Sequence, residues 1–249
     1  LDAGDEVIIP APYWVSYPDM VLLADGTPVI VAAGQEQGFK ITPAQLAAAI
    51  TPRTRLVILN SPCNPTGAAY SRAELVALGA VLARHPDIVI ATDDIYEPVW
   101  WGPEPFCSFA TACPDLYPRT VTINGVSKSY AMTGWRIGYC GGPAELVTAM
   151  ATIQGQSTSN PSSISQKAAT VALNGPQDCV AEMCRAFRAR HDLVLAGLNA
   201  LPGVSCLPGW GTFYAFANVT GAMRAVGSAD DSAFAEFLIN QAGVAVVPG

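Results

Sequence analysis

The stretch TVTINGVSK (residues 120–128) begins as a β-branched, apolar run and ends in a short polar turn that carries a lysine. Similar apolar runs occur along the chain at 6–10, 28–32, 55–59, 88–91 and 136–140. Several are almost continuous runs of Val, Ile and Leu, which is typical of strands that are buried on both faces.

Segments with the spacing of amphipathic helices lie between these runs, at 16–24, 43–50, 71–85 and 143–156. Thr42-Pro43 and Ser71 are favourable residues at which to begin a helix. Because strands and helices alternate, the sequence predicts an α/β fold with a mostly parallel sheet covered by helices.

The pattern changes after residue 176. We expect a long helix at 177–201, a Gly-rich segment with short strands at 204–219, a helix at 229–242 and a last strand at 244–249. We interpret residues 1–187 as a large domain and residues 188–249 as part of a smaller α+β domain. The chain begins and ends within such elements, so we expect it to be an internal piece of a longer protein.

The composition argues against several classes of protein. Hydrophobic residues make up 51% of the chain and charged residues 13%, which favours a large core over disorder. The net charge of −7, without a basic run, argues against nucleic-acid binding. No apolar run is long enough to span a membrane. The seven cysteines contain no Cys-x-x-Cys pair, and only two histidines occur, so we expect free thiols, no metal site and a cytoplasmic location.

Polar clusters follow three of the expected strands, at 60–67, 92–96 and 124–128, and a fourth at 133–136 precedes the next strand. In open α/β sheets, ligands bind beyond the carboxyl ends of the strands. No Gly-x-Gly-x-x-Gly follows a strand and no P-loop lysine occurs, so neither dinucleotide nor P-loop phosphate binding is indicated.

Lys128 is the lysine that chemistry favours among the three in the chain. Lys40 lies in a polar turn and Lys167 in a helical segment, whereas Lys128 directly follows an apolar strand. Desolvation makes a lysine amine nucleophilic, and a nucleophilic amine forms Schiff bases. A surface lysine at the mouth of a loop is the alternative interpretation.

Asp93 has the position that a pyridoxal-phosphate site requires for an acid. It closely follows the apolar run 88–91, and a carboxylate there would keep the pyridine nitrogen of the cofactor protonated. An ion pair at about 4 Å is worth about 4 kcal/mol at an effective dielectric constant near 20. Tyr96 lies three residues later and offers a hydroxyl to the phenolate oxygen of the cofactor. Alternatively, Asp93 or Asp94 only caps the following turn.

Three blocks of the chain resemble the class I and II aminotransferases: SPCNPTG (61–67), DDIYE (93–97) and SKSYAMTGWRIGY (127–139). Two further blocks, PAPYWVSYP (10–18) and SNPSSISQ (159–166), resemble the bacterial aspartate aminotransferase subgroup. The resemblance extends over essentially the whole chain. It implies the type I fold of pyridoxal-phosphate-dependent transferases, with residues 1–187 as the cofactor-binding domain.

The resemblance also implies roles at the cofactor. Lys128 would form the Schiff base and later move a proton between the substrate and the cofactor. Asp93 would pair with the pyridinium nitrogen, and both Tyr96 and Asn64 would hydrogen-bond the phenolate oxygen. Arg136 would bind the phosphate through its two-pronged guanidinium.

Further roles implied by the resemblance concern the ring face, the substrate and a second subunit. Trp14 would stack on the cofactor ring and contact the substrate, and Asn64 would also lie near the substrate carboxylate. Ser159 and Asn160 match a segment that approaches the partner subunit's site, which implies a homodimer with shared active sites. Phe213 matches a position that lines the substrate pocket.

The chain also departs from the family pattern. Gly125 stands where many relatives have a phosphate-binding serine three residues before the lysine. The Gly-rich phosphate loop and a tyrosine that crosses the dimer would precede Leu1. The arginine that holds the substrate α-carboxylate would follow Gly249.

The implied reaction is amino transfer between an amino acid, with aspartate favoured, and a 2-oxo acid such as 2-oxoglutarate. Aromatic, prephenate or broad specificity stays open. Two other functions also stay open: a pyridoxal-phosphate lyase or decarboxylase of the same fold, and a ligand-sensing aminotransferase-like domain of a transcription regulator.

Overall fold

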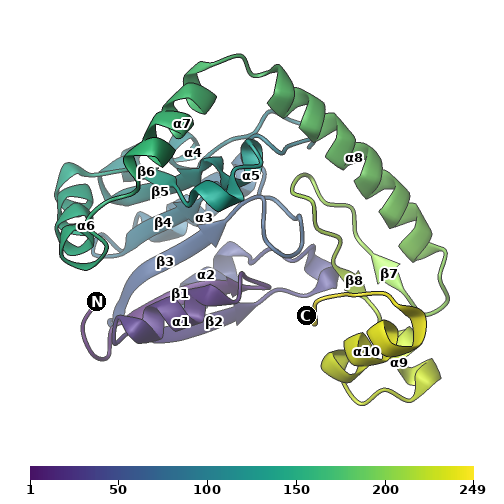
Figure 1. Cartoon of the computed structure of the whole chain (residues 1–249). Helices are drawn as coiled ribbons and strands as arrows, with labels where there is room; N and C mark the ends of the chain where they lie inside the picture. Colours follow the sequence, from purple (N-terminus) through teal and green to yellow (C-terminus); the bar gives the residue numbers. More distant parts are fainter.

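The computed structural model describes residues 1–249, and a six-stranded sheet forms its centre (Figure 1). The strand order is β2-β1-β3-β4-β5-β6. Neighbouring strands are parallel except for β5 and β6, which are antiparallel. The strands are β1 (Glu6–Ala11), β2 (Thr27–Ala32), β3 (Thr54–Asn60), β4 (Val89–Asp93), β5 (Thr120–Gly125) and β6 (Gly138–Gly141). The predicted α/β class and mostly parallel sheet are therefore confirmed.

The larger apolar core lies on the face of the sheet that is covered by α2 (Pro43–Ala49), α3 (Arg72–Leu82) and α4 (Phe109–Ala112). Side chains of a strand alternate between the two faces of a sheet. The strand residues that reach this core are Ile8, Val57, Leu59 and Ile90.

The opposite face contains a smaller cluster under α1 (Ser16–Leu23). Val7 and Ile9, which flank Ile8 in β1, pack there against Tyr17 and Val21 of the helix. This packing fixes α1 beside the end of β1 and so determines where the Tyr17 side chain lies.

Two helices begin at the residues that the sequence indicated. Thr42 accepts a hydrogen bond from the backbone N–H of Gln45, whose side chain in turn bonds the backbone of Thr42. Ser71 and Glu74 form the same reciprocal capping box at the start of α3. Both predicted helix starts are confirmed.

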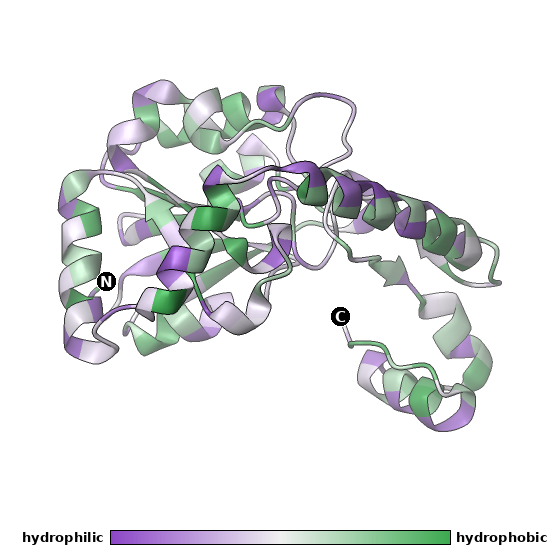
Figure 2. Cartoon of the chain, turned by 45° about the horizontal axis from the view of Figure 1, so that its top comes forward, coloured by the Kyte–Doolittle hydropathy of each residue, from purple (hydrophilic) through white to green (hydrophobic).

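The chain continues from the sheet through α6 (Ala144–Ser157) and α7 (Ser163–Asn174) into the long helix α8 (Asp178–Asn199), which extends away from the sheet (Figure 1). Hydrophobic and hydrophilic residues alternate along α8 (Figure 2). The proposed domain boundary between residues 187 and 188 falls within this helix. No helix of the chain has the length and apolar character needed to cross a membrane.

The last part of the chain contains less strand than the sequence predicted. Its elements are β7 (Ser205–Cys206), β8 (Ala217–Asn218), α9 (Thr220–Val226), α10 (Asp231–Phe237) and the π-helical turn η4 (Leu238–Ala242). The predicted last strand at 244–249 is wrong, because these residues have no regular structure and no strand pairs with them. An apolar run becomes a strand only where a neighbouring strand accepts its hydrogen bonds. Helix α9 was not predicted.

A substitution in the α3 core tests the packing of this helix on the sheet. Leu78 is 1% exposed, and Leu78→Ala should lower the free energy of unfolding by about 2–5 kcal/mol, because it removes buried methyl groups and leaves a cavity. Val76 lies on the solvent side of the same helix, 46% exposed, and Val76→Ala should change stability by only about 0.5 kcal/mol. Urea unfolding of both variants measures the difference, and equal losses would contradict this placement of α3.

Candidate active site

Four strands bring polar residues to one edge of the sheet. Because β1, β3, β4 and β5 are parallel, their carboxyl ends lie at the same edge. β6 is antiparallel to β5, with Gly125 opposite Gly138, so the segment before β6 also begins at this edge. The polar clusters that the sequence singled out therefore converge, as expected for a ligand site in an open α/β sheet.

Asp93, the last residue of β4, is held by three different parts of the chain. The Tyr17 hydroxyl donates to Asp93 Oδ2 at 2.5 Å, and the backbone N–H of Ile95 donates to Oδ1 at 3.1 Å. Asn60, at the end of β3, donates its amide to the backbone oxygen of Asp93 at 2.8 Å. Hydrogen bonds from the protein itself thus fix the direction of the Asp93 carboxylate.

The electrostatics at Asp93 combine opposing effects. Burial raises the pKa of the carboxyl, while the Tyr17 hydroxyl, the Ile95 N–H and the positive charge of Lys128 each oppose that rise. Burial also raises the pKa of the Tyr17 phenol, so Tyr17 keeps its proton and is the donor in their hydrogen bond. Two hydrogen bonds and one nearby positive charge thus stabilise the ionised form of Asp93 against the effect of burial.

Lys128 lies in the short helix α5 (Val126–Ser129), directly after β5. Its Nζ is 5.5 Å from the centre of the Phe213 ring. The Phe213 ring meets the buried Tyr96 ring edge-on, with centroids 5.6 Å apart. The structure thus brings together Asp93, Tyr96, Lys128 and Phe213, four of the predicted site residues.

Asn64 and Trp14 lie at the border of this group. The backbone N–H of Asn64 donates to Asn60 Oδ1 at 2.7 Å, so Asn60 connects the loop after β3 to Asp93. Trp14 is partly exposed and its ring packs edge-on against Tyr17, with centroids 5.5 Å apart.

The remaining predicted residues make no side-chain hydrogen bond or ion pair with this group. Arg136 is exposed, has the left-handed φ of +49°, and donates from Nη1 to the backbone oxygen of Thr133 at 3.1 Å. Ser159 and Asn160 are exposed between α6 and α7. Their predicted roles stay predictions.

Sequence reasoning missed three residues that shape the site: Tyr17, Asn60 and Tyr214. The hydrogen-bond partners of these side chains are 76, 33 and 118 residues away in the sequence. Tyr17 and Asn60 were within motifs that the sequence singled out, but nothing in a local motif identifies a distant partner.

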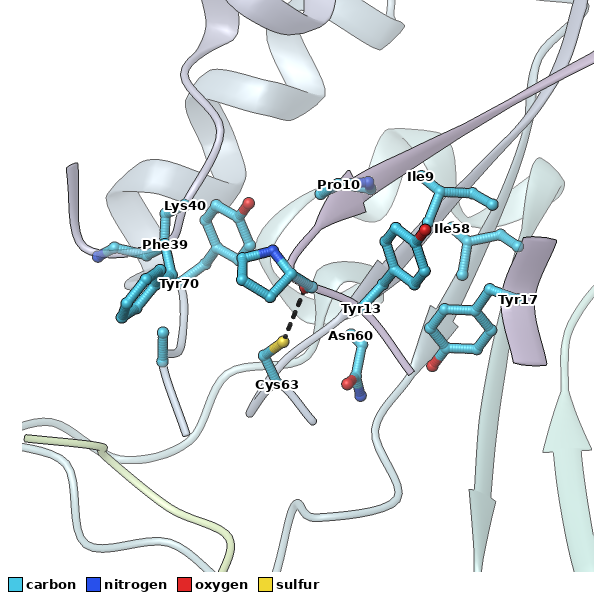
Figure 3. A pocket seen from close by; sticks show the side chains of 12 residues that line it. Ile9, Pro10, Tyr13, Tyr17, Phe39, Lys40, Ile58, Asn60, Cys63 and Tyr70 are labelled. Carbon is cyan, nitrogen blue, oxygen red and sulfur yellow. Dashed lines mark hydrogen bonds between the residues drawn. The ribbon is translucent and has the colours of Figure 1, made fainter. Parts of the chain in front are cut away.

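A small hollow lies next to the site, at the carboxyl ends of β1 and β3 (Figure 3). Tyr17 and Asn60 line it on one side and Phe39 and Lys40 on the other. Cys63, also in its wall, is within 3.4 Å of the backbone oxygen of Pro12. The two polar residues that orient Asp93 therefore border this space as well.

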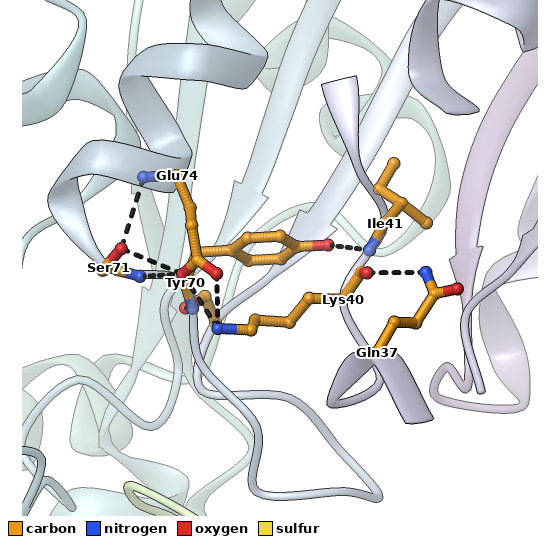
Figure 4. Close-up of polar contacts among 7 residues, drawn as sticks. Gln37, Lys40, Ile41, Tyr70, Ser71 and Glu74 are labelled. Atoms are coloured by element: carbon orange, nitrogen blue, oxygen red, sulfur yellow. Dashed lines mark hydrogen bonds and ion pairs between the residues drawn. The ribbon is translucent and has the colours of Figure 1, made fainter. Parts of the chain in front are cut away.

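The other two lysines have different surroundings. Lys40 Nζ is 2.6 Å from Glu74 Oε1 and 5.2 Å from the centre of the Trp210 ring, in the polar cluster at the start of α3 (Figure 4). Lys167 is exposed on α7. Lys128 is thus the lysine that stands at the carboxyl edge beside Asp93 and Tyr96.

Asp94 follows Asp93 but points into the protein, where it is 1% exposed. Thr92 Oγ1 bonds its Oδ1 at 2.6 Å, while Oδ2 is buried without a hydrogen-bond partner. Burial raises the pKa of Asp94 to about 7. The two adjacent carboxyl groups therefore have different environments, and only Asp93 faces the site residues.

Comparisons with known proteins agree with these features. Residues 1–249 match the family described as aminotransferase class I and II. Aspartate/prephenate aminotransferases of Nitrosomonas europaea and Cereibacter sphaeroides are 55% and 59% identical over 255 and 254 residues, including all of this chain and 64% of each relative. The crystal structure of the Rhizobium meliloti aspartate aminotransferase is 51% identical with a TM-score of 0.94, and 63% of it is covered by the whole of this chain. The chain thus spans less than two thirds of these relatives.

The buried Asp94 carboxyl predicts a pH-dependent stability. Its folded pKa of about 7 lies above the ordinary value of 3.8, so the folded state binds the proton more tightly and loses stability as pH rises from about 4 to about 7. Asp94→Asn should therefore be more stable than the wild type at pH 8, by at most on the order of 4 kcal/mol, with the difference shrinking toward pH 4.

Urea unfolding at several pH values measures this difference. Asp19→Asn is the control, because Asp19 is an exposed carboxyl on α1. A constant difference between Asp94→Asn and the wild type across this pH range would contradict a raised pKa of the buried Asp94 carboxyl.

Proposed function

The chain belongs to the class I and II aminotransferases, and on that premise we propose that its protein transfers an amino group between an amino acid and a 2-oxo acid with pyridoxal phosphate as cofactor. The observation that carries the proposal is the group formed by Asp93, Tyr96 and Lys128 at the carboxyl edge of the sheet. An acid, a phenol and an amine in one place are the groups that this cofactor needs around its ring.

The donor set fits the cofactor. Asp93 accepts one hydrogen bond at each carboxylate oxygen, and each oxygen has two lone pairs, so capacity remains for a pyridinium N–H. Burial raises the pKa of the Tyr96 phenol, which keeps it protonated as a donor. When bound, pyridoxal phosphate withdraws electrons from the substrate Cα into its protonated ring.

We assign the chain's own residues as follows. Lys128 would hold the cofactor covalently and carry the proton that leaves and returns at the substrate Cα. Asp93, held by Tyr17, would keep the ring nitrogen protonated, and Tyr96 and Asn64 would donate to the ring oxygen. Arg136 would bind the phosphate.

Three residues would shape the substrate side. Trp14, packed on Tyr17, would cover one face of the ring and contact the substrate. Asn64 would also approach the substrate carboxylate. Phe213, which lies beneath the amine of Lys128, would line the substrate pocket.

We propose aspartate as the amino donor and 2-oxoglutarate as the acceptor. The names of the two relatives, both aspartate/prephenate aminotransferases, support aspartate and make prephenate the second acceptor to test.

We also propose a homodimer with shared active sites, in which Asn160 approaches the partner subunit's site. The exposed apolar residues Met150 and Ile153 of α6 and Ile164 of α7 support a partner that covers these two helices. The seven free cysteines support a cytoplasmic location. The division into residues 1–187 and 188–249 remains our proposal for the domains.

The covalent attachment is tested by borohydride reduction of the intact gene product loaded with pyridoxal phosphate, followed by peptide mapping. The label should appear on Lys128, because its amine lies beside the proposed ring-binding residues. The variant Lys128→Ala is the control and should give no label. A label on Lys40 or Lys167 in the wild type would contradict the assignment.

The role of Asp93 is tested by steady-state assays of the intact gene product with aspartate and 2-oxoglutarate. Asp93→Asn should lower kcat by roughly a hundredfold or more, because a neutral amide cannot stabilise the ring charge as the substrate proton leaves. Asp94→Asn keeps Asp93 in place and should change kcat only a few-fold. Equal losses in both variants would contradict a specific role of Asp93 at the ring nitrogen. Release of ammonia or carbon dioxide without amino transfer would favour a lyase or a decarboxylase.

A further inference from the structure

The hydroxyl of Tyr214 is 2.9 Å from the hydroxyl of Tyr96, across 118 residues of sequence. The two rings also meet edge-on, with centroids 5.9 Å apart. Tyr96 is 2% exposed, so water has little access to compete for this contact. Tyr214 is thus the protein side chain that hydrogen-bonds the Tyr96 hydroxyl.

The loop that carries Tyr214 is fixed against the segment that follows Tyr96. Thr212 donates its backbone N–H to the oxygen of Val99 at 3.0 Å, and its Oγ1 accepts from the backbone N–H of Tyr214 at 3.2 Å. A Cβ on Gly211 would lie 2.4 Å from the Val99 oxygen, so the two backbones approach more closely than a side chain would allow. These backbone contacts therefore help to hold the Tyr214 hydroxyl next to the Tyr96 hydroxyl.

The direction of the hydrogen bond follows from the chemistry of phenols. Each hydroxyl has one proton to give and lone pairs to accept with. If Tyr96 donates its proton to the ring oxygen of the cofactor, its oxygen is left to accept the proton of Tyr214. A phenol that accepts a hydrogen bond becomes a stronger donor, because consecutive hydrogen bonds polarise one another.

We propose that Tyr214 is a positioning residue for the reaction: its hydroxyl donates to Tyr96 and directs the Tyr96 proton toward the ring oxygen of pyridoxal phosphate. This inference rests on the proposed function. By this inference, the loop at 207–214, which follows α8, lines the site and also influences the hydrogen bond that Tyr96 donates to the cofactor.

The test is a pH titration of the visible absorption of bound pyridoxal phosphate in the intact gene product, for wild type, Tyr96→Phe, Tyr214→Phe and the double variant. A donor at the ring oxygen stabilises the negative charge of that oxygen. Losing the donor concentrates this charge, which makes the proton on the neighbouring Schiff-base nitrogen of Lys128 harder to remove. The pH at the midpoint of the absorption change, called the transition, should therefore be higher in Tyr96→Phe than in the wild type. In Tyr214→Phe it should move in the same direction but by less, on the order of half a pH unit, because the effect of Tyr214 reaches the ring oxygen only through the Tyr96 hydroxyl.

The double variant separates a positioning role from a merely structural one. Tyr214→Phe should add no shift in the Tyr96→Phe background, because its effect passes through the Tyr96 oxygen. The control Tyr117→Phe, at a hydroxyl on an exposed side chain, should leave the transition at the wild-type pH.

Two results would overturn the inference: an unchanged transition in Tyr214→Phe, or an equal shift in the presence and absence of the Tyr96 hydroxyl. A wild-type protein with no label on Lys128 after borohydride reduction would instead overturn the proposed function, and this inference with it.

Discussion

The parallel pairing of β3 and β4 is the constraint on which the site depends. It places Asn60 beside Asp93 in register, and the Asn60 amide then bonds the backbone of Asp93. Strands β1 and β5 flank this pair on either side and end at the same edge. Because parallel strands need crossover connections, the polar residues at this edge come from segments far apart in the sequence. Without this alignment, the same residues would be scattered loop positions.

The two adjacent aspartates at the end of β4, Asp93 and Asp94, have different environments because their side chains point in different directions. Asp93 turns toward the site and receives a tyrosine hydroxyl, a backbone N–H and the charge of a nearby lysine. Asp94 turns inward, where burial raises its pKa to about 7. Successive side chains in extended backbone point to opposite sides. The Asp93 carboxylate is thus directed to the site, whereas the carboxyl of the next residue, Asp94, is directed into the interior.

The last part of the chain contributes to the site through backbone contacts. Trp210 donates its N–H to the oxygen of Gly67, and a Cβ on Gly209 would lie 3.1 Å from the Gly67 Cα. Such an approach is possible because glycine has no side chain. The loop after β3 and the loop at 207–214 are thereby held together. Phe213 and Tyr214 reach Lys128 and Tyr96 from this loop.

The sequence by itself determined the elements whose signals are local. Continuous apolar runs predicted the strands of the sheet, and Thr42 and Ser71 marked two helix starts that the structure confirms. The same alternation predicted the edge at which Asp93, Tyr96 and Lys128 meet. These predictions succeed because burial pattern and capping depend on residues a few positions apart.

Only the tertiary structure decided which side chains touch across the edge. The bonds from Tyr17 to Asp93 and between Tyr96 and Tyr214 join residues 76 and 118 positions apart. The run at 244–249 looks like a strand in the sequence, yet it has none to pair with. A strand needs a neighbour and a hydrogen bond needs a partner at the right distance, and both are properties of the folded chain as a whole.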